Sequence, residues 1–475
     1  MEIESIFRLG ISILFTLIAV VTGFVIITEN RNPLKSIAWV TVLVLFPVVG
    51  LVAYFFFGKN FRKQKIISKK SIKRIQKHSN RDFKENVSFD FIPEEYKGLT
   101  TLLYQNNESL PYADNAVSVY TNGPDAFDSV FTEIEKATHH IHVQFFIFNN
   151  DKIGNSFKDL LAKKTAEGVQ VRLIYDSLGS WRLGRKFVKK LNDLGIETGS
   201  FLKVNLPFFS NKVNYRNHRK VVVIDGKVGF IGGMNVADRY ITGSTLGTWR
   251  DTLIKIEGNA VHGLQNAFLI DWYFIHRTYI TSAEYYPLLQ STGNKLVQTV
   301  TSGPDSDWEA ILQSFCKLIS TAKSYVYMQT PYFLPPEDLL SAIKIAALSG
   351  VDVRLMISEN SDAPVTSIAS RSYLREIMNA GVKVYFYNNG FIHSKTIVAD
   401  DLISTIGSTN MDFRSFELHF EINSFVYDND FAVEMREIYL KDLENSKEIQ
   451  LSTWRKREKW KKFNESFARL FSPLL

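Results

Sequence analysis

Two long runs of uncharged, mostly apolar residues open the chain. The first covers residues 9–28, the second covers residues 36–58, and the link between them reads E-N-R-N-P-L-K. A helix rises about 1.5 Å per residue, so twenty residues reach about 30 Å, the thickness of a bilayer core. Pro47 lies inside the second run, where a neighbouring helix can compensate for the lost backbone hydrogen bond. The pattern predicts a hairpin of two transmembrane helices.

Two other interpretations of these apolar runs are less favourable. A secretory signal peptide would end in a small-residue cleavage site, but none follows here and a second apolar run does. Two buried helices of a soluble protein would carry more charge than runs of this length show.

From residue 117 onward, short apolar strands alternate with helical stretches, and the whole pattern occurs twice. T-N-G-P-D at 121–125 returns as T-S-G-P-D at 301–305, and E-G-V-Q-V-R-L-I at 167–174 returns as S-G-V-D-V-R-L-M at 349–356. Alternating helices and strands are typical of α/β folds. We therefore predict two similar α/β lobes that face each other, with any shared site at their interface.

The repeat and the changes in composition divide the chain into five segments. The predicted order is a transmembrane hairpin, a basic linker, a first lobe, a second lobe and a basic amphipathic segment, at residues 1–58, 59–114, 115–290, 291–440 and 441–475.

Charge places the predicted hairpin in a membrane with a defined orientation. The chain carries a formal net charge of +7, and residues 59–77 hold nine Lys or Arg and no acid. Basic residues that follow a span favour the cytoplasmic side and attract anionic headgroups. We expect a multi-pass protein of the cell membrane, with two spans, its large C-terminal part in the cytoplasm and anionic lipids as partners.

Two further segments are candidates for lipid contact. The insertion L-P-F-F at 206–209 has basic neighbours and either dips into the interface or packs as a loop. The tail places Trp460, Phe463 and Phe467 near one helical face with dense basic charge opposite. That pattern is typical of an interfacial helix, and a helix packed on its own lobe is the alternative.

One short motif stands at the same place in both repeats. N-H-R-K-V-V-V-I-D at 217–225 and I-H-S-K-T-I-V-A-D at 392–400 share a histidine, a lysine two residues on and an aspartate five residues after that. In a strand, the histidine and the lysine would lie on one face, because side chains alternate with period two. Each lobe would then direct one imidazole and one ammonium group toward the same place.

Two imidazoles and two ammonium groups suit the transfer of a phosphoryl group. Lysine binds phosphate as a point charge. An imidazole titrates near pH 6.5, so one histidine can attack as the neutral base while the other donates a proton to the leaving oxygen. A metal site is disfavoured, because lysine is normally a cation and the single cysteine, Cys316, excludes a Cys-rich site.

The doubled His-x-Lys-x-x-x-x-Asp, each copy followed by Gly-Gly-x-Asn or Gly-Ser-x-Asn, resembles the phospholipase D superfamily. The resemblance covers residues 115–430, and the apolar runs, I-G-G-M-N and W-R-D make the whole chain similar to the bacterial cardiolipin synthases. It implies two homologous lobes related by a pseudo-two-fold axis, each a mixed sheet flanked by helices. It also implies that no metal and no other cofactor is needed.

The resemblance assigns roles to residues that match the family motif. His218 and His393 would be nucleophile and general acid/base, and each would be oriented by a carboxylate on the next strand, Asp251 after the first motif and Glu421 after the second. Phosphate would be held by five further residues, Lys220, Lys395, Asn235, Asn410 and Ser408. Asp225 and Asp400 complete the catalytic motif and are expected to be structural. Gly233 replaces the serine found in the second repeat, and His419 is expected to face away from Glu421's neighbours.

The implied reaction joins two phosphatidylglycerol molecules into cardiolipin and releases glycerol through a phosphatidyl-histidine, with His218 as the attacking group. The residues leave the acceptor open, since water would give a phospholipase D and serine a phosphatidylserine synthase. A membrane-bound nuclease and a non-catalytic scaffold are the other classes; the apolar runs argue against nucleic acid as a partner, and two intact motifs argue against a scaffold. The sequence does not define the oligomeric state.

Overall fold

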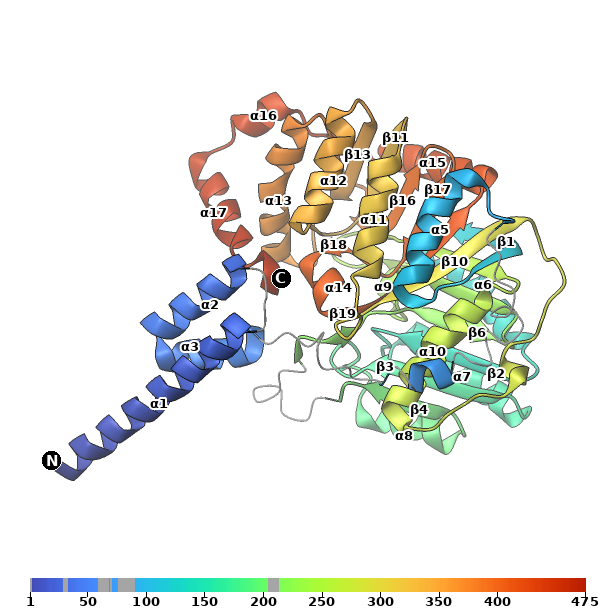
Figure 1. Cartoon of the computed structure of the whole chain (residues 1–475). Coiled ribbons are helices and arrows are strands. Elements are labelled where there is room, and N and C mark those ends of the chain that lie inside the picture. The colour runs from blue at the N-terminus through green and yellow to red at the C-terminus, as the bar shows by residue number, and fades with distance from the viewer. Residues whose placement is uncertain (1, 29–32, 59–67, 69–70, 76–89, 204–212) are drawn as a thin grey trace. The chain divides into compact units, whose positions relative to one another are not determined.

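The computed structural model describes the chain except for residues 1, 29–32, 59–67, 69–70, 76–89 and 204–212 (Figure 1). The described residues divide into two compact units, the N-terminal helices and a body that holds most of the chain from residue 65 onward. Most of the predicted basic segment at 59–77 and the whole L-P-F-F insertion at 206–209 lie outside the described residues.

The N-terminal unit is helical over its described residues, with α1 at Glu2–Thr28, α2 at Pro33–Leu45, α3 at Pro47–Ala53 and a π-helix at Tyr54–Gly58. The single helix predicted over 36–58 is divided, because Pro47 cannot continue α2 and instead begins α3. Ile26, Leu43 and Tyr54 are buried together in this unit. Among the described residues, no helix combines the length and the apolar character needed to cross a membrane.

In the body, sixteen of the described strands form one mixed sheet that runs through both repeats, fifteen of them in one continuous order and β5 Arg216–Asn217 paired beside it. From the centre outward, the first half has the order β1 Pro111–Tyr120, β9 Leu253–Glu257, β7 Val228–Gly232, β6 Val221–Ile224, β2 His140–Phe145, β3 Gln170–Asp176 and β4 Glu197–Phe201. The second half has the order β10 Lys295–Ser302, β19 His419–Tyr427, β17 Ile403–Gly407, β16 Thr396–Ala399, β11 Tyr325–Gln329, β13 Asp352–Ser358, β14 Lys383–Tyr387 and β20 Ser446–Glu448.

The two halves have equivalent strand orders on either side of a central antiparallel pair, apart from the additional edge strand β20 in the second half. β1 and β10 meet there, with Pro111 opposite Gln298 and Tyr112 opposite Val297. We call the half that begins with β1 the first lobe and the half that begins with β10 the second lobe. The predicted α/β fold, a mixed sheet with flanking helices, is confirmed, and both halves belong to one continuous sheet.

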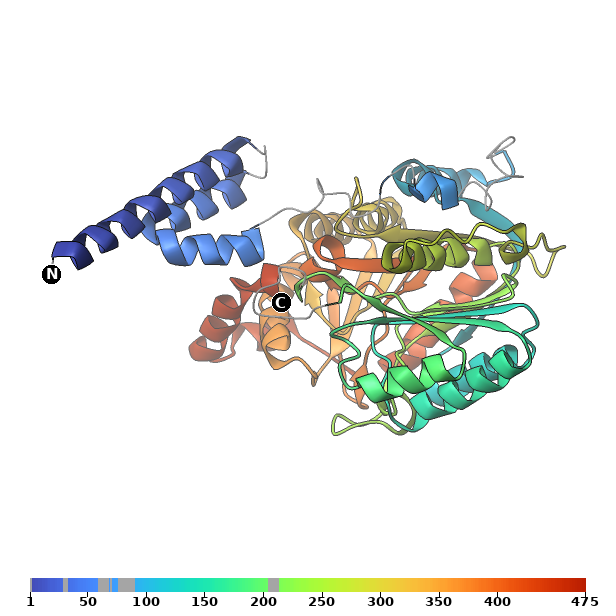
Figure 2. The same cartoon turned by 90° about the horizontal axis from the view of Figure 1, so that it is seen from below.

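Helices lie on both faces of this sheet (Figures 1 and 2). Those of the first repeat are α6 Gly123–Glu135, α7 Lys152–Ala166, α8 Arg185–Asp193, α9 Arg239–Thr242 and α10 Val261–His276, followed by a 3₁₀ turn at Ala283–Tyr285. Those of the second are α11 Ala310–Thr321, α12 Glu337–Leu348, α13 Pro364–Asn379, α14 Phe413–Glu417 and α15 Asn429–Leu443. α5 at Glu94–Asn107 precedes the sheet, and α16 Leu451–Arg455, α17 Lys459–Arg469 and a 3₁₀ turn at Ser472–Leu474 follow it.

Short parallel pairs tie the two lobes together. β5 at Arg216–Asn217, in the first lobe, pairs with the start of β19 in the second. β8 at Trp249–Arg250 pairs with β15 at Phe391–Ile392 in the same way. A further pair, β12 Phe333–Leu334 with β18 Met411–Asp412, lies within the second lobe. The first two pairs bring each histidine motif against the opposite lobe.

The motif aspartates stand at the far end of the strands that follow the motif histidines. Asp225 has φ of 53° and accepts hydrogen bonds from the backbone N–H groups of Thr138, His139 and His140 at 2.8–2.9 Å. Asp400 accepts from three backbone N–H groups, those of Lys323, Ser324 and Tyr325. Burial opposes ionisation of Asp225, but these N–H groups bring its pKa below the ordinary value. Each aspartate therefore fastens a turn to the start of a neighbouring strand.

A buried histidine network lies beside Asp225 in the first lobe. His140 and His142 on β2 are fully buried, and Gln265 of α10 lies between them, 3.3 Å from Nε2 of the first and 2.8 Å from Nδ1 of the second. Arg172 lies 3.2 Å from Nε2 of His142. Burial, followed by the charge of His139, lowers the pKa of His140 to about 4, although Asp225 acts in the opposite direction. Burial, followed by His140 and Arg172, lowers the pKa of His142 well below 6.5.

This network predicts that stability falls in mild acid. Below pH 6.5 the unfolded chain binds protons at His140 and His142 that the folded chain does not, so unfolding becomes more favourable as pH decreases. Each histidine contributes a slope of up to about 1.4 kcal/mol per pH unit from pH 6.5 down to its folded pKa. The free energy of unfolding of the full chain in detergent, measured by denaturant titration between pH 7.5 and 4.5, checks this.

His140→Gln and His142→Gln should each make the free energy of unfolding less dependent on pH, because each removes the uptake of about one proton on unfolding. A profile with the same slope in both variants and in the unchanged chain would show that other groups cause the acid sensitivity.

Candidate active site

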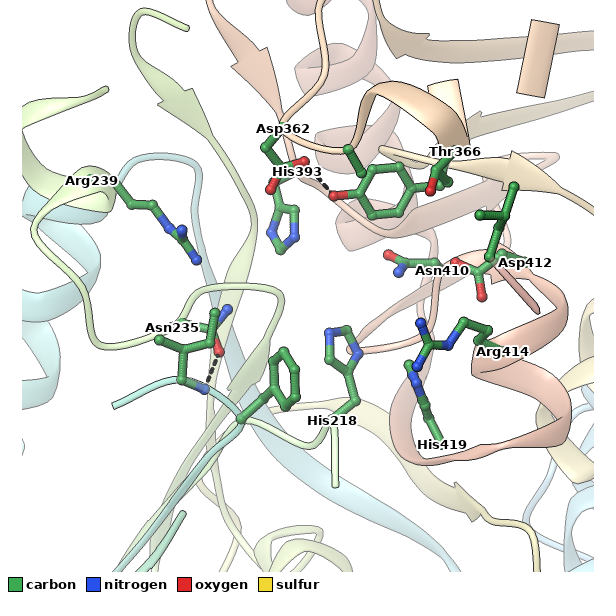
Figure 3. Close-up of a pocket in the computed structure, with 15 residues that line it drawn as sticks. His218, Asn235, Arg239, Asp362, Thr366, His393, Asn410, Asp412, Arg414 and His419 are labelled. Atoms are coloured by element: carbon green, nitrogen blue, oxygen red, sulfur yellow. Dashed lines mark hydrogen bonds between the residues drawn. The ribbon is translucent and has the colours of Figure 1, made fainter. Parts of the chain in front are cut away.

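A cavity of about 220 Å³ is lined by both lobes of the body (Figure 3). The first lobe contributes Phe146, Ile147, His218, Asn235 and Arg239. The rest of the wall is formed by Tyr332, Asp362, Ala363, Thr366, His393, Asn410, Asp412, Arg414, His419 and Leu475. In Figure 3 the rings of His218 and His393 project toward each other from opposite sides.

Each of these histidines is bonded to a carboxylate of the opposite lobe. Nδ1 of His218 lies 2.9 Å from Oε1 of Glu421 on β19. Nδ1 of His393 lies 2.6 Å from Oδ2 of Asp251, which directly follows β8. Both carboxylates are fully buried. The histidine–carboxylate pairs are therefore exchanged between the lobes.

The short parallel pairs produce this exchange. The backbone N–H of His218 donates to the carbonyl of Phe420 at 2.9 Å, directly beyond the pairing of β5 with β19. The backbone N–H of His393 donates to the carbonyl of Arg250 at 2.7 Å, beyond the pairing of β15 with β8. The short strand before each motif histidine therefore pairs with the opposite lobe, and this pairing brings the histidine to the carboxylate of that lobe.

The expected continuous strand through the motif is not present. β5 ends at Asn217 and β6 begins at Val221, so His218 and Lys220 occupy the link between two strands, and His393 and Lys395 occupy the equivalent link. The reason is that β5 and β15 pair with the opposite lobe, whereas β6 and β16 pair within their own. The backbone has to change partners between them.

The carboxylates fix the tautomer of both histidines. An Nδ1–H group must donate to the carboxylate, so Nε2 carries the lone pair on the opposite side of the ring. His218 Nδ1 also lies 3.0 Å from the carbonyl of Ser408, a second acceptor for the same proton. Burial, followed by the charges of the two motif lysines, lowers the pKa of His218 and of His393 well below 6.5.

The motif lysines are buried behind the histidines and do not line the cavity. Nζ of Lys220 donates to the carbonyl of His218 at 2.5 Å, and Nζ of Lys395 donates to the carbonyl of His393. Burial lowers the pKa of Lys395 to about 8, although Asp251 and Glu421 raise it. In this arrangement the lysines supply positive charge to the cavity from below its surface.

The two Gly-x-x-Asn turns differ at their second residue, Gly233 in one and Ser408 in the other, and the nearby carboxylates Asp251 and Glu421 explain this difference. A Cβ at Gly233 would lie 2.2 Å from Oδ1 of Asp251, so a side chain there would displace that carboxylate. At the equivalent place Ser408 donates its hydroxyl to Oε2 of Glu421 and does not line the cavity. The Ser408 hydroxyl therefore holds Glu421 in this structure, and its contact with phosphate stays a prediction.

The two asparagines that end these turns do line the cavity. Asn235 accepts from the backbone N–H of Ile147 at 3.0 Å and donates to the hydroxyl of Tyr240 at 2.9 Å. Oδ1 of Asn410 is buried and has no hydrogen-bond partner among the described residues. Asp225 and Asp400, in contrast, lie outside the lining.

His419 was expected to face away from this region, and that prediction is wrong. Its Nδ1 lies 3.7 Å from Oε1 of Glu421, its ring lies 5.5 Å from that of His218, and it lines the cavity. The expectation failed because His419 begins β19 at the edge where β5 joins it, so its ring reaches the cavity instead of the core. Burial lowers the pKa of His419 to about 3.

One group of potential metal ligands occurs among the described residues. The ligand atoms of His218, His419 and Glu421 lie within 4.8 Å of one another. A metal bound to all three would take the Glu421 oxygen that now accepts from His218. Such a site would compete with the hydrogen bond that orients His218.

The sequence interpretation missed several cavity residues, of which two have a recognisable signal. Arg239 follows Asn235 by four residues, and Arg414 follows Asn410 by four residues, so the repeat extends beyond the motif. Tyr332 donates its hydroxyl to Asp362, and no feature of the sequence indicated that pair.

Together these groups can carry out nucleophilic substitution on an anion. Two imidazoles with fixed Nδ1–H tautomers face one space, and four buried or half-buried cations surround it, Lys220, Lys395, Arg239 and Arg414. One ring can attack while the other transfers a proton.

Comparison with known proteins identifies relatives over nearly the whole chain. The family described as "Cardiolipin synthase, PLD-like domain" matches residues 130–272 and 315–443, and the family described as "Phospholipase_D-nuclease N-terminal" matches residues 14–59. A cardiolipin synthase of Geobacillus sp. (strain WCH70) is 40% identical over 98% of this chain and 94% of that protein. The major cardiolipin synthase ClsA of Bacillus subtilis (strain 168) is 40% identical over 99% of this chain and 100% of that protein.

A solved structure shares the fold. The phosphatidylserine synthase of Haemophilus influenzae Rd KW20 has a TM-score of 0.62 and 15% sequence identity, and covers 80% of this chain and 100% of that one.

The fit of Asp251 against Gly233 can be tested through stability. Gly233→Ala should lower the free energy of unfolding by about 1–3 kcal/mol, because the new Cβ has to displace a buried carboxylate. Gly98→Ala is the matched control: Gly98 lies in α5 with no atom closer than 3.4 Å, so alanine there should stabilise the chain by about 0.5–1 kcal/mol. Denaturant titration of both variants provides the comparison. An unchanged free energy of unfolding in Gly233→Ala would contradict the close contact between Gly233 and Asp251.

Proposed function

This chain belongs to the bacterial cardiolipin synthases of the phospholipase D superfamily, and we propose that its two facing histidines transfer a phosphatidyl group from one phosphatidylglycerol to another. The products would be cardiolipin and glycerol. The observation that carries the proposal is the exchanged pair of histidine–carboxylate hydrogen bonds around one cavity, His218 with Glu421 and His393 with Asp251.

In the first step, Nε2 of neutral His218 attacks the phosphorus of the donor lipid. The bond from phosphorus to the headgroup glycerol breaks, and protonated His393 gives its Nε2 proton to the glycerol oxygen as it leaves. The result is a phosphatidyl-histidine, free glycerol and a neutral His393. The negative phosphate supports this protonation state, since it favours the charged form of a histidine whose pKa is lowered by burial and then by the surrounding cations.

In the second step, the terminal hydroxyl of a second phosphatidylglycerol gives its proton to Nε2 of His393. Its oxygen attacks the phosphorus, and the bond from phosphorus to His218 breaks. Cardiolipin leaves with the enzyme in its starting state. Asp251 and Glu421 act by holding the Nδ1–H tautomers throughout.

The remaining motif residues support the phosphate from several sides. Asn410 lies in the cavity wall, where the N–H group of its side-chain amide can donate to a phosphate oxygen, and Asn235 lies opposite in the first lobe. Lys220 and Lys395 act by their charge on the transferred phosphate, and Ser408 acts through Glu421. Asp225 and Asp400 would have a structural role, because each accepts hydrogen bonds from the backbone at the start of a neighbouring strand.

The N-terminal helices would anchor the enzyme in the cell membrane. Residues 9–28 and 36–58 contain no charged residue, and large apolar side chains of α1, among them Leu14, Leu17 and Phe24, are exposed. Two spans with the basic residues 59–77 after them would keep the body on the cytoplasmic side.

The C-terminal helix α17 offers a second contact with lipid. Its inner face packs on the second lobe through Ala468, while Trp460, Phe463 and Phe467 form an exposed stripe with ring centroids 5.6 Å and 6.4 Å apart. The inner face thus packs as a helix on its own lobe, and the exposed stripe supports a role of the outer face at the lipid interface. Exposed basic residues accompany the stripe, among them Arg455, Lys456, Lys459 and Lys461.

The stripe continues toward the cavity. Leu470, Phe471 and Leu474 are also exposed, and the next residue, Leu475, lines the cavity wall. Apolar side chains with basic neighbours fit the interface of an anionic bilayer. We place this surface against the lipid that supplies the substrate.

Lipid analysis tests the reaction. The full chain, reconstituted with labelled phosphatidylglycerol and no added metal, should form cardiolipin and glycerol in equal amounts. His218→Ala and His393→Ala should each lower the rate by about 10³-fold or more, because they remove the nucleophile or the proton donor. His262→Gln is the matched control, since His262 is buried in α10 and lies outside the cavity lining.

Other products would overturn specific parts of the proposal. Phosphatidic acid without cardiolipin would make water the acceptor, and no lipid product would remove the phospholipid reaction altogether. Trapping the covalent adduct and mapping it to His393 would reverse the roles of the two histidines.

The lipid contact of α17 can be tested with brominated phospholipids, which quench tryptophan in acyl chains. Trp460→Phe should remove part of the bromine quenching of the reconstituted full chain, because Trp460 is 68% exposed on the stripe. Trp454→Phe is the control: Trp454 is buried, with Arg457 3.2 Å above its ring. Equal quenching in Trp460→Phe and the unchanged chain would show that α17 does not enter the bilayer.

A further inference from the structure

The cavity holds one arginine on each side of the histidine pair. Arg239 lies on α9 in the first lobe and Arg414 on α14 in the second, each four residues after the asparagine of its own repeat. Figure 3 shows their guanidinium groups on opposite sides of His218 and His393. The repeat thus supplies two cationic groups in addition to the two motif lysines.

Arg239 belongs to the His393 side of the cavity. Its Cζ lies 4.5 Å from the ring centroid of Trp249, and that ring lies 5.5 Å from the ring of His393. Its charge contributes, after burial and the two lysines, to the low pKa of His393. Arg414 lies on the other side, where Figure 3 shows it beside His218 and His419.

Arg239 has unused hydrogen-bonding capacity. Its Nε is buried and has no hydrogen-bond partner, and no carboxylate within the described part of the chain forms an ion pair with it. The Nε of Arg414 is likewise unpartnered, but the charge of Asp412 acts on that guanidinium. A half-buried, permanently charged group without an anionic partner suits an anionic ligand.

The reaction geometry indicates which anion that is. If His218 attacks the phosphorus, the leaving glycerol departs on the His393 side, and the acceptor hydroxyl arrives on the same side. An acceptor phosphatidylglycerol carries its own phosphodiester one glycerol unit from the attacking oxygen. That second phosphate has to lie near His393 and away from the transferred phosphorus, which is the region of Arg239.

We propose that Arg239 binds the phosphodiester of the acceptor lipid and thereby selects an anionic phospholipid over water or a neutral alcohol. A guanidinium group can form two parallel hydrogen bonds with a phosphodiester, which a lysine cannot. Trp249 holds the planar group from behind. This inference rests on the proposed function and names the residue that determines its second substrate.

A competition between two acceptors tests the inference. The full chain in phosphatidylglycerol vesicles with a neutral primary alcohol such as 1-propanol would form cardiolipin and phosphatidylpropanol from the same intermediate. In Arg239→Gln the ratio of cardiolipin to phosphatidylpropanol should fall about tenfold or more, a typical effect of losing a charged hydrogen bond. The ratio is the readout, and not the total release of glycerol, because Arg239 is also one of the cations around the transferred phosphate.

Three comparisons make the outcome specific. Arg239→Lys should restore part of the ratio through charge alone. Arg182→Gln, at an exposed arginine outside the cavity, should leave the ratio unchanged. A normal ratio in Arg239→Gln, or a fall in Arg414→Gln instead, overturns the assignment to Arg239. An unchanged chain that forms phosphatidylpropanol but no cardiolipin overturns the proposed function, and this inference with it.

Discussion

The exchange of carboxylates between the lobes is the interaction on which the rest of this structure depends. His218 needs Glu421 of the second lobe, and His393 needs Asp251 of the first. Neither lobe alone therefore contains a complete histidine–carboxylate pair. The short parallel pairs of β5 with β19 and β15 with β8 produce the exchange, and the central pairing of β1 with β10 holds the two halves at the required distance. Duplication therefore gives one shared site instead of two separate ones.

The charges around that site act on the protonation of both imidazoles. Lys220 and Lys395 are buried and donate to backbone carbonyls, so their charge remains directed at a cavity whose two carboxylates already bond to histidines. Burial, followed by the charges of these lysines, lowers the pKa of both imidazoles well below 6.5. A phosphate reverses this, because its charge favours protonation of one ring. The substrate thus helps to create the acid that its own reaction needs.

The sequence predicts the fold class and the paired motif well because both depend on local periodicity and on exact repetition. It does not predict the exchange, since the spacing of His218 and Asp251 along the chain is the same whether they pair within a lobe or across it. The wrong expectation for His419 has the same cause: its exposure depends on β5 of the other lobe. Arg239 and Arg414 repeat as regularly as the motif, but only the cavity shows that their side chains meet a ligand-sized space.

The difference between Gly233 and Ser408 bears on which histidine attacks. The two turns are otherwise equivalent, but the shorter Asp251 approaches the backbone where Gly233 leaves room, whereas the longer Glu421 is held by the Ser408 hydroxyl. Nδ1 of His218 consequently has two acceptors, Glu421 and the Ser408 carbonyl, while Nδ1 of His393 has Asp251 at 2.6 Å and the Tyr240 hydroxyl at 3.3 Å. A hydrogen bond from Nδ1–H to a carboxylate increases the basicity of Nε2, and the shorter of the two carboxylate bonds is that of His393. The ring with the more basic Nε2 binds the proton first. This asymmetry supports His218 as the nucleophile and His393 as the group that moves the proton.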